Sequence, residues 1–308
     1  MASADTDTSV ANAAHRAWLA EEFIKAAATA DATVCGGPLV FGWNDRSAGA
    51  RVATTSGDHW LRLVVEQQVW AGGEFWTGNT DASVITGMAK PRVLRHWDWT
   101  DGSWAVRAEL MTLVEGAPCS PTPELRAPVA LPNIWWQELR SSLAALATTR
   151  TERTHLRQAD ITRRLEVFFG DRPGDPTIGR WTAAHADLHW ANLLAPHCVL
   201  VDWEGWGLAP TGYDAACLYV HSLLVPATAA RVAAELDERL RVRDGLLAQL
   251  YATTRLLQRV DQGDYPDMAI PLHRNAERVL DQLAATPRPP SADVAGTVPA
   301  SQGTRGSG

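Results

Sequence analysis

The segment spanning residues 182–214, TAAHADLHWANLLAPHCVLVDWEGWGLAPTGYD, constrains the fold of this chain more than any other stretch. Two short apolar runs, residues 193–194 and 199–201, are separated by four residues, a length typical of a hairpin connection. Antiparallel pairing of these runs would bring Asn192, which precedes the first, close to Asp202, which follows the second. The sequence therefore predicts that an amide and a carboxylate meet at one end of a hairpin.

Oxygen-bearing side chains of this kind indicate a magnesium site. Mg²⁺ takes one or two protein oxygen ligands and completes its shell with phosphate oxygens and water. Asn192 and Asp202 are the candidate metal ligands, and a nucleoside triphosphate would supply the phosphate oxygens. Asp187 lies on the loop that leads into the hairpin, where its carboxylate would accept the proton of an attacking hydroxyl group.

The run HADLHWAN at residues 185–192, followed by VDWE at 201–204, resembles the catalytic-loop motif and metal-binding aspartate of the aminoglycoside phosphotransferases. These are small-molecule kinases of the protein-kinase-like and choline-kinase-like superfamily. The resemblance implies that His185 props the metal-binding segment and that Asp214 braces the catalytic loop through backbone hydrogen bonds. Ala186 stands where the family usually has glycine, a change that the loop tolerates only if its backbone angles stay in the ordinary allowed regions.

The first half of the chain resembles this family more weakly. Residues 42–54 would form a strand-turn-strand that covers the nucleotide phosphates, and the next strand, HWLRLVV, carries Arg62 where the family has a lysine. Arginine keeps the charge and makes strong charge-assisted bonds to phosphate, although its geometry differs from that of an ammonium group. Its expected acidic partner is Glu74 or Asp81.

Residues 109–115, followed by Gly116, resemble the hinge between the two lobes of the family. The resemblance implies that backbone groups in this segment recognise the adenine base. The candidate nucleotide-binding positions here are Glu109, Met111 and Leu113.

Periodicity along the chain predicts the fold class. Short strand-like runs separated by Gly, Asn, Asp and Ser clusters continue to about residue 115, interrupted by one expected helix at residues 76–85. From residue 132 onward the apolar spacing is helical, with further helices expected near 228–241, 244–260 and 272–284. We expect an α+β, bilobal, protein-kinase-like fold, with an antiparallel sheet lobe and a mostly helical C-terminal lobe.

The expected domain boundaries follow from the same pattern. They are a disordered tail at 1–12, a nucleotide-binding lobe at 13–115, a catalytic and substrate-binding lobe at 116–285 and a second disordered tail at 286–308.

Charge and cysteine usage exclude several classes of partner. The formal net charge is −7 and no block of lysines or arginines occurs, so neither nucleic acid nor an anionic membrane is an expected partner. The four cysteines share no metal-ligand spacing, and we expect reduced thiols. No secretory signal or transmembrane run is evident, so a cytoplasmic location is expected; the sequence leaves the oligomeric state open.

The expected activity is transfer of the γ-phosphate of ATP or GTP, with Mg²⁺, to a hydroxyl group of a small molecule. The family favours an antibiotic acceptor such as an aminoglycoside, with a metabolite or a peptide hydroxyl as alternatives. Two other hypotheses stay open. The pattern His185-x-Asp187-x-His189 also fits a zinc or iron hydrolase. Arg62 and the absence of a GxGxxG loop fit a catalytically weak, kinase-like binding protein.

Overall fold

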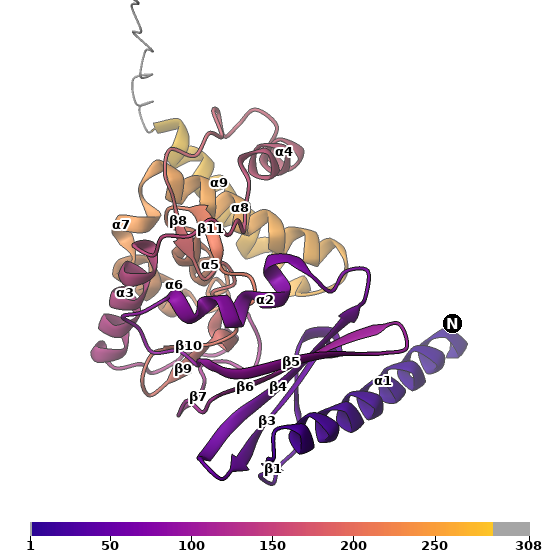
Figure 1. The fold of residues 1–308 in the computed structure, drawn as a ribbon. Coiled ribbons are helices and arrows are strands. Elements are labelled where there is room, and N and C mark those ends of the chain that lie inside the picture. The colour runs from indigo at the N-terminus through magenta and orange to yellow at the C-terminus, as the bar shows by residue number, and fades with distance from the viewer. Residues whose placement is uncertain (1, 286–308) are drawn as a thin grey trace, which may run out of the picture.

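The computed structural model describes residues 2–285 of the chain, with side chains from residue 12 onward. An antiparallel sheet with one long helix forms the first part of the molecule, and helices form most of the second (Figure 1). This arrangement confirms the predicted α+β, kinase-like fold class. The tail expected at residues 286–308 lies outside the described residues.

The sheet of the first part is built from antiparallel strands in the order β1-β3-β4-β6-β5, with β2 paired to β3. The strands are β1 (Thr33–Val34), β2 (Val40–Phe41), β3 (Ser47–Thr54), β4 (Gly57–Gln67), β5 (Val93–Asp101) and β6 (Trp104–Thr112). Side chains alternate between the two faces of a strand. In β4, Leu61 and Leu63 are fully buried in the apolar cluster that also contains α1. Arg62, between them, therefore points to the opposite face of the sheet.

Helix α1 (Ala2–Thr29) lies along one face of the sheet and packs on β3 and β4 (Figure 1). Leu19 and Phe23 of this helix are fully buried against the strands. The disordered tail predicted at residues 1–12 is therefore wrong from Ala2 onward. Small residues suggested disorder, but five of residues 2–14 are alanine, the strongest helix former.

Helix α2 (Gly73–Asp81) lies between the sheet and the helical part (Figure 1). It begins three residues earlier than the predicted helix at 76–85, and a 3₁₀ turn, η2 (Ala82–Val84), completes that predicted span. Ala82 and Ile85 pack in the core of the helical part. The segment that follows α2 thus belongs in sequence to the first part and in packing to the second.

The second part combines the predicted helices with two small sheets. Its helices are α3 (Asn133–Ala147), α4 (Gln158–Phe169), α5 (Tyr213–Val220), α6 (Pro226–Glu235), α7 (Asp237–Leu240), α8 (Arg243–Asp261) and α9 (Ala269–Ala285). Its strands are β7 (Ala117–Pro118), β8 (Trp181–Ala184), β9 (Leu193–Ala195), β10 (Val199–Leu200) and β11 (Gly207–Pro210), and 3₁₀ turns occur at Trp190–Asn192 and Pro266–Met268. Trp135, Trp190 and Trp203 are fully buried in its core. Within residues 2–285, no helix combines the length and apolar character that crossing a membrane requires.

Candidate active site

The predicted hairpin is present and brings its two ends together. Strands β9 and β10 pair antiparallel, with Leu193 opposite Leu200. One residue further out, the backbone N–H of Val201 donates to the backbone oxygen of Asn192 at 3.0 Å. Asp202 follows directly and has a left-handed φ of +67°. Asn192 and Asp202 therefore leave the hairpin at the same end, as their positions in the sequence predicted.

The amide of Asn192 is oriented by the catalytic loop. Its Nδ2 group donates to the backbone oxygen of Asp187 at 3.0 Å. Among the described residues, no donor is bonded to its Oδ1 atom, and the carboxylate of Asp202 is half-exposed. One amide oxygen and one carboxylate, both available, are a donor set that fits Mg²⁺ with phosphate and water as further ligands.

The carboxylate of Asp187 faces the same region and is 49% exposed. Its Oδ2 atom lies 3.4 Å from Nε2 of His189. Burial alone would raise the pKa of Asp187, but the hydrogen bond and charge of His189, together with Arg255 and His185, hold it well below the usual value of a carboxyl. Asp187 is therefore ionised at neutral pH and can accept a hydrogen bond from a hydroxyl group.

Asp214 holds the backbone of the catalytic loop. Its two carboxylate oxygens accept hydrogen bonds from the backbone N–H groups of His185 and Ala186, at 2.8 and 2.9 Å. The ring of His185 is fully buried, and its Nε2 atom lies 2.9 Å from the backbone oxygen of Val201, next to Asp202. These are the contacts expected of the two supporting residues.

The zinc or iron hydrolase alternative needs the rings of His185 and His189 to converge with Asp187. Instead, Nε2 of His185 bonds to backbone, and its ring packs edge-on against Trp203 with centroids 4.6 Å apart. Within residues 2–285 no group of three or more His, Cys, Asp or Glu side chains has the arrangement of a metal site. The geometry does not favour this alternative.

The condition stated for alanine at position 186, ordinary backbone angles, is wrong, because the loop accommodates Ala186 without them. Its φ is +73°, in the left-handed region that favours glycine. The residue is fully buried, and the loop is fixed on both sides by the bonds of Asp214. An alanine at this position thus holds a backbone conformation that favours glycine.

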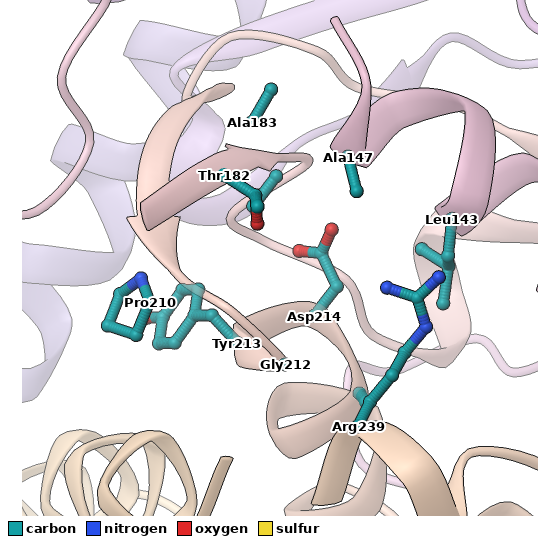
Figure 2. A pocket seen from close by; sticks show the side chains of 11 residues that line it. Leu143, Ala147, Thr182, Ala183, Pro210, Gly212, Tyr213, Asp214 and Arg239 are labelled. Carbon is teal, nitrogen blue, oxygen red and sulfur yellow. The ribbon is translucent and has the colours of Figure 1, made fainter. Parts of the chain in front are cut away.

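A small pocket lies beside Asp214. Figure 2 shows Asp214 and the side chain of Arg239 facing into it, with Leu143 and Thr182 among the other lining residues. Its free volume of about 10 Å³ is room for one water molecule. Burial raises the pKa of Asp214, whereas His185, the loop amides and Arg239 oppose the rise.

Arg62 reaches the site from the sheet. Its guanidinium lies 3.2 Å from Oε2 of Glu109, also pairs with Glu204, and lies 3.7 Å from Oδ1 of Asp202. Burial would lower the pKa of Arg62, but these carboxylates raise it instead. The guanidinium is therefore a permanent cation beside the candidate metal ligand.

The predicted pairing of Arg62 with Glu74 or Asp81 is wrong. Helix α2 starts at Gly73, so its two carboxylates lie at its ends and face the loop before α4. Glu74 accepts the backbone N–H of Thr154 at 2.9 Å, and Asp81 pairs with Arg153 at 2.6 Å.

Asn79 is a site residue that the sequence did not reveal. It is 5% exposed, its Nδ2 group donates to Oε2 of Glu109 at 2.9 Å, and its Oδ1 atom accepts the backbone N–H of Trp203 at 2.9 Å. In the sequence, Asn79 stands out only as a poor helix former within the short helix predicted at residues 76–85.

The hinge begins later than predicted. Strand β6 extends to Thr112, with Glu109 opposite both Arg62 and His96. Met111 also lies between two paired strands. The backbone groups of Glu109 and Met111 are therefore used within the sheet. The expected recognition of adenine by these two positions is wrong. Leu113 follows the strand and remains the candidate position for contact with a base.

The sheet with its helix, the helical second part and the loop-hairpin site between them define a protein-kinase-like fold. Solved structures with this fold include a thermostable mutant of aminoglycoside phosphotransferase APH(4)-Ia in ternary complex with ADP and hygromycin B. It matches with a TM-score of 0.58 at 14% identity, over 87% of this chain and 98% of that one. The GDP complex of aminoglycoside 2'-phosphotransferase-IIIa matches with a TM-score of 0.51 at 14% identity, over 86% and 98% of the two chains.

Comparison of the sequence with protein-family models and with curated proteins gave no match. The structural likeness therefore concerns the fold, and the chemistry has to be argued from the residues of this chain.

Proposed function

We propose that this protein is a phosphotransferase that moves the γ-phosphate of ATP or GTP to a hydroxyl group of a small molecule. The observation that carries the proposal is the convergence of Asp187, Asn192 and Asp202 at one end of the β9–β10 hairpin. The same region holds the cation of Arg62, and the fold is that of structures solved with ADP or GDP.

Each residue has a role in this reaction. Asn192 and Asp202 hold Mg²⁺, which when bound neutralises negative charge on the phosphates. Arg62 contacts phosphate oxygens, and the backbone beside Leu113 contacts the base. Asp187 orients the acceptor hydroxyl and takes its proton. The hydroxyl oxygen forms a bond to the γ-phosphorus as the bond from that phosphorus to the bridging oxygen breaks, and the nucleoside diphosphate leaves.

We propose an antibiotic acceptor first, because the structures cited above are aminoglycoside phosphotransferases; a metabolite or a peptide hydroxyl is the alternative. A cytoplasmic location, where nucleoside triphosphates are abundant, is part of the proposal.

A catalytically weak, nucleotide-binding protein is the second candidate. Arg62 favours it, because its guanidinium is already paired with Glu109 and Glu204 and has to share its donors with the phosphates. The intact set of Asp187, Asn192 and Asp202 favours the enzyme.

A thermal melt with Mg-ATP, Mg-GTP and Mg-ADP tests the nucleotide site. A nucleotide at about 100 times its dissociation constant adds about 2.7 kcal/mol to the free energy of unfolding. We expect this stabilisation to depend on magnesium and to be lost in Asp202→Ala, because that variant lacks one of the two metal ligands. A magnesium-dependent shift of full size in Asp202→Ala would contradict the proposed site. Absence of any shift in the wild type would contradict nucleotide binding itself.

A further inference from the structure

We propose that Asn79 of α2 is a positioning residue. It holds the side chain of Arg62 and the backbone at Asp202 in the relative orientation that binding the phosphates of the nucleotide requires. The inference rests on the proposed function, because it concerns how the same site is held ready. Asn79 touches neither Arg62 nor Asp202 directly. It acts through one partner on each side.

The amide of Asn79 has a single possible orientation. The backbone N–H of Trp203 can only donate and the carboxylate of Glu109 can only accept, so Oδ1 faces Trp203 and Nδ2 faces Glu109. All three residues are buried. Because an unpaired polar group in such surroundings costs about 1 to 3 kcal/mol, both bonds are strongly favoured.

The hydrogen bond to Glu109 links Asn79 to the guanidinium of Arg62. Oε2 of Glu109 accepts from Nδ2 of Asn79 at 2.9 Å and from the guanidinium of Arg62 at 3.2 Å. Glu109 is 1% exposed on a strand that pairs on both sides, so its position is fixed by the sheet. Its other oxygen, Oε1, lies 3.5 Å from Nε of Arg107, so Asn79 and Arg107 together set the rotamer of the carboxylate, and Asn79 is the one that bonds to the oxygen shared with Arg62.

The hydrogen bond to Trp203 links Asn79 to the backbone of Asp202, the candidate metal ligand. The N–H of Trp203 and the C=O of Asp202 belong to one planar peptide group. Holding that N–H fixes the orientation of the peptide plane that follows Asp202, a residue with a left-handed φ. Helix α2 also touches this segment at Gly78, where a Cβ atom would lie 2.1 Å from the backbone oxygen of Glu204.

An amide suits this position better than a carboxylate. Three carboxylates, those of Glu109, Asp202 and Glu204, already surround the single guanidinium of Arg62. A fourth at position 79 would face Glu109 with like charge in buried surroundings, which is unfavourable. The neutral amide supplies the donor that Glu109 accepts and the acceptor that Trp203 requires.

The test compares two buried asparagines. Asn79→Ala removes the proposed link. Asn275→Ala is the matched control, because Asn275 is 4% exposed in α9, donates to Thr253 at 3.2 Å and accepts from Arg278 at 2.7 Å. Dissociation constants for Mg-ATP and for adenosine are measured below the melting temperature of each variant. If Asn79→Ala does not fold, Asn79→Ser, which keeps one hydrogen-bonding group, replaces it.

We expect Asn79→Ala to weaken Mg-ATP binding by about tenfold or more, the loss of roughly one good hydrogen bond to a charged group, with adenosine binding nearly unchanged. Asn79→Asp, which adds the unfavourable charge, should weaken Mg-ATP binding further. The control should leave both ligands nearly unaffected. Equal losses for Mg-ATP and adenosine, or no difference between Asn79→Ala and Asn275→Ala, would overturn the inference.

Amide hydrogen exchange of the peptide containing Trp203 separates this inference from the proposed function. Exchange should rise in Asn79→Ala and stay unchanged in Asn275→Ala, with no nucleotide present. If the wild type does not bind Mg-ATP while exchange rises as expected, the proposed function fails and the link from Asn79 stands. Unchanged exchange in Asn79→Ala overturns the inference, whatever the nucleotide does.

Discussion

Ala186 shows how much of the catalytic loop depends on backbone conformation. A left-handed φ costs an L-residue about 1 to 2 kcal/mol relative to ordinary angles. The two oxygens of Asp214 offset this cost by bonding the N–H groups of His185 and Ala186. The loop therefore keeps a shape that its own residue at position 186 disfavours, and Asp214 is what maintains it.

Ala186→Gly is expected to be at least about 1 kcal/mol less destabilising than Ala184→Gly. Glycine relieves the strain of a left-handed φ at position 186, and position 184 has no such strain. Both alanines are buried, and Ala184 lies in the extended strand β8. Urea denaturation of the two variants provides the measurement. Equal losses of unfolding free energy would mean that the conformation at Ala186 stores no strain.

Site residues were predictable where the contacts between them are local. Asp187, Asn192 and Asp202 lie in one short segment, and the hairpin pattern was enough to bring them together. The partners of Arg62 are different, since Glu109 and Glu204 lie 47 and 142 residues away in sequence. The pair with Glu109 depends on the register of β4 against β6, and the pair with Glu204 depends on how the two parts of the molecule meet. Residue types and spacing encode neither.

Helix α1 is the element whose role was least evident from sequence. Its alanine-rich start resembles a flexible tail, and only packing on the sheet shows that the helix completes a core. Helices in folded proteins gain most of their stability from such tertiary contacts. Likewise, the predicted helix at 76–85 was shifted because its start depends on Gly73, a residue with low helix propensity.

Neighbouring residues of α1 allow a direct test of its packing. Phe23 is fully buried and Ile24 is 59% exposed. We expect Phe23→Ala to lower the free energy of unfolding by about 3 to 5 kcal/mol through loss of buried surface and formation of a cavity. Ile24→Ala should change it by less than about 0.5 kcal/mol. Chemical denaturation measures both, and a small effect of Phe23→Ala would show that α1 is not part of the cooperative fold.

At the scale of the whole molecule, Arg153 is one of the side chains that tie α2 to the helical part. Arg153 pairs with Asp81 at 2.6 Å and donates to backbone oxygens of Glu74, Glu204 and Trp206 at 2.7, 3.2 and 3.0 Å. One side chain thus ties both ends of α2 to the segment after Asp202.

Replacing Arg153 with methionine should destabilise the protein by about 2 to 3 kcal/mol, because several buried acceptors lose charged donors. Arg163→Met is the control, since Arg163 is 77% exposed in an i,i+3 pair with Asp160 and should contribute less than about 0.5 kcal/mol. Urea unfolding followed by both far-UV circular dichroism and tryptophan fluorescence reports the loss. Similar stabilities of the two variants would argue against Arg153 as a tie between α2 and the helical part.

The contact at Gly78 makes the rotation of α2 about its own axis important for the geometry of the candidate site. Successive residues of an α-helix point about 100° apart, so Gly78 and Asn79 present adjacent faces of one short helix. Gly78 meets the backbone at Glu204 with no side chain between them, and Asn79 reaches past that contact to Glu109 and Trp203. Turning the helix about its own axis would break both bonds of Asn79 without separating the two parts of the molecule. The arrangement of Arg62 and the segment at Asp202 is thus described by one angle, the rotation of α2 about its own axis.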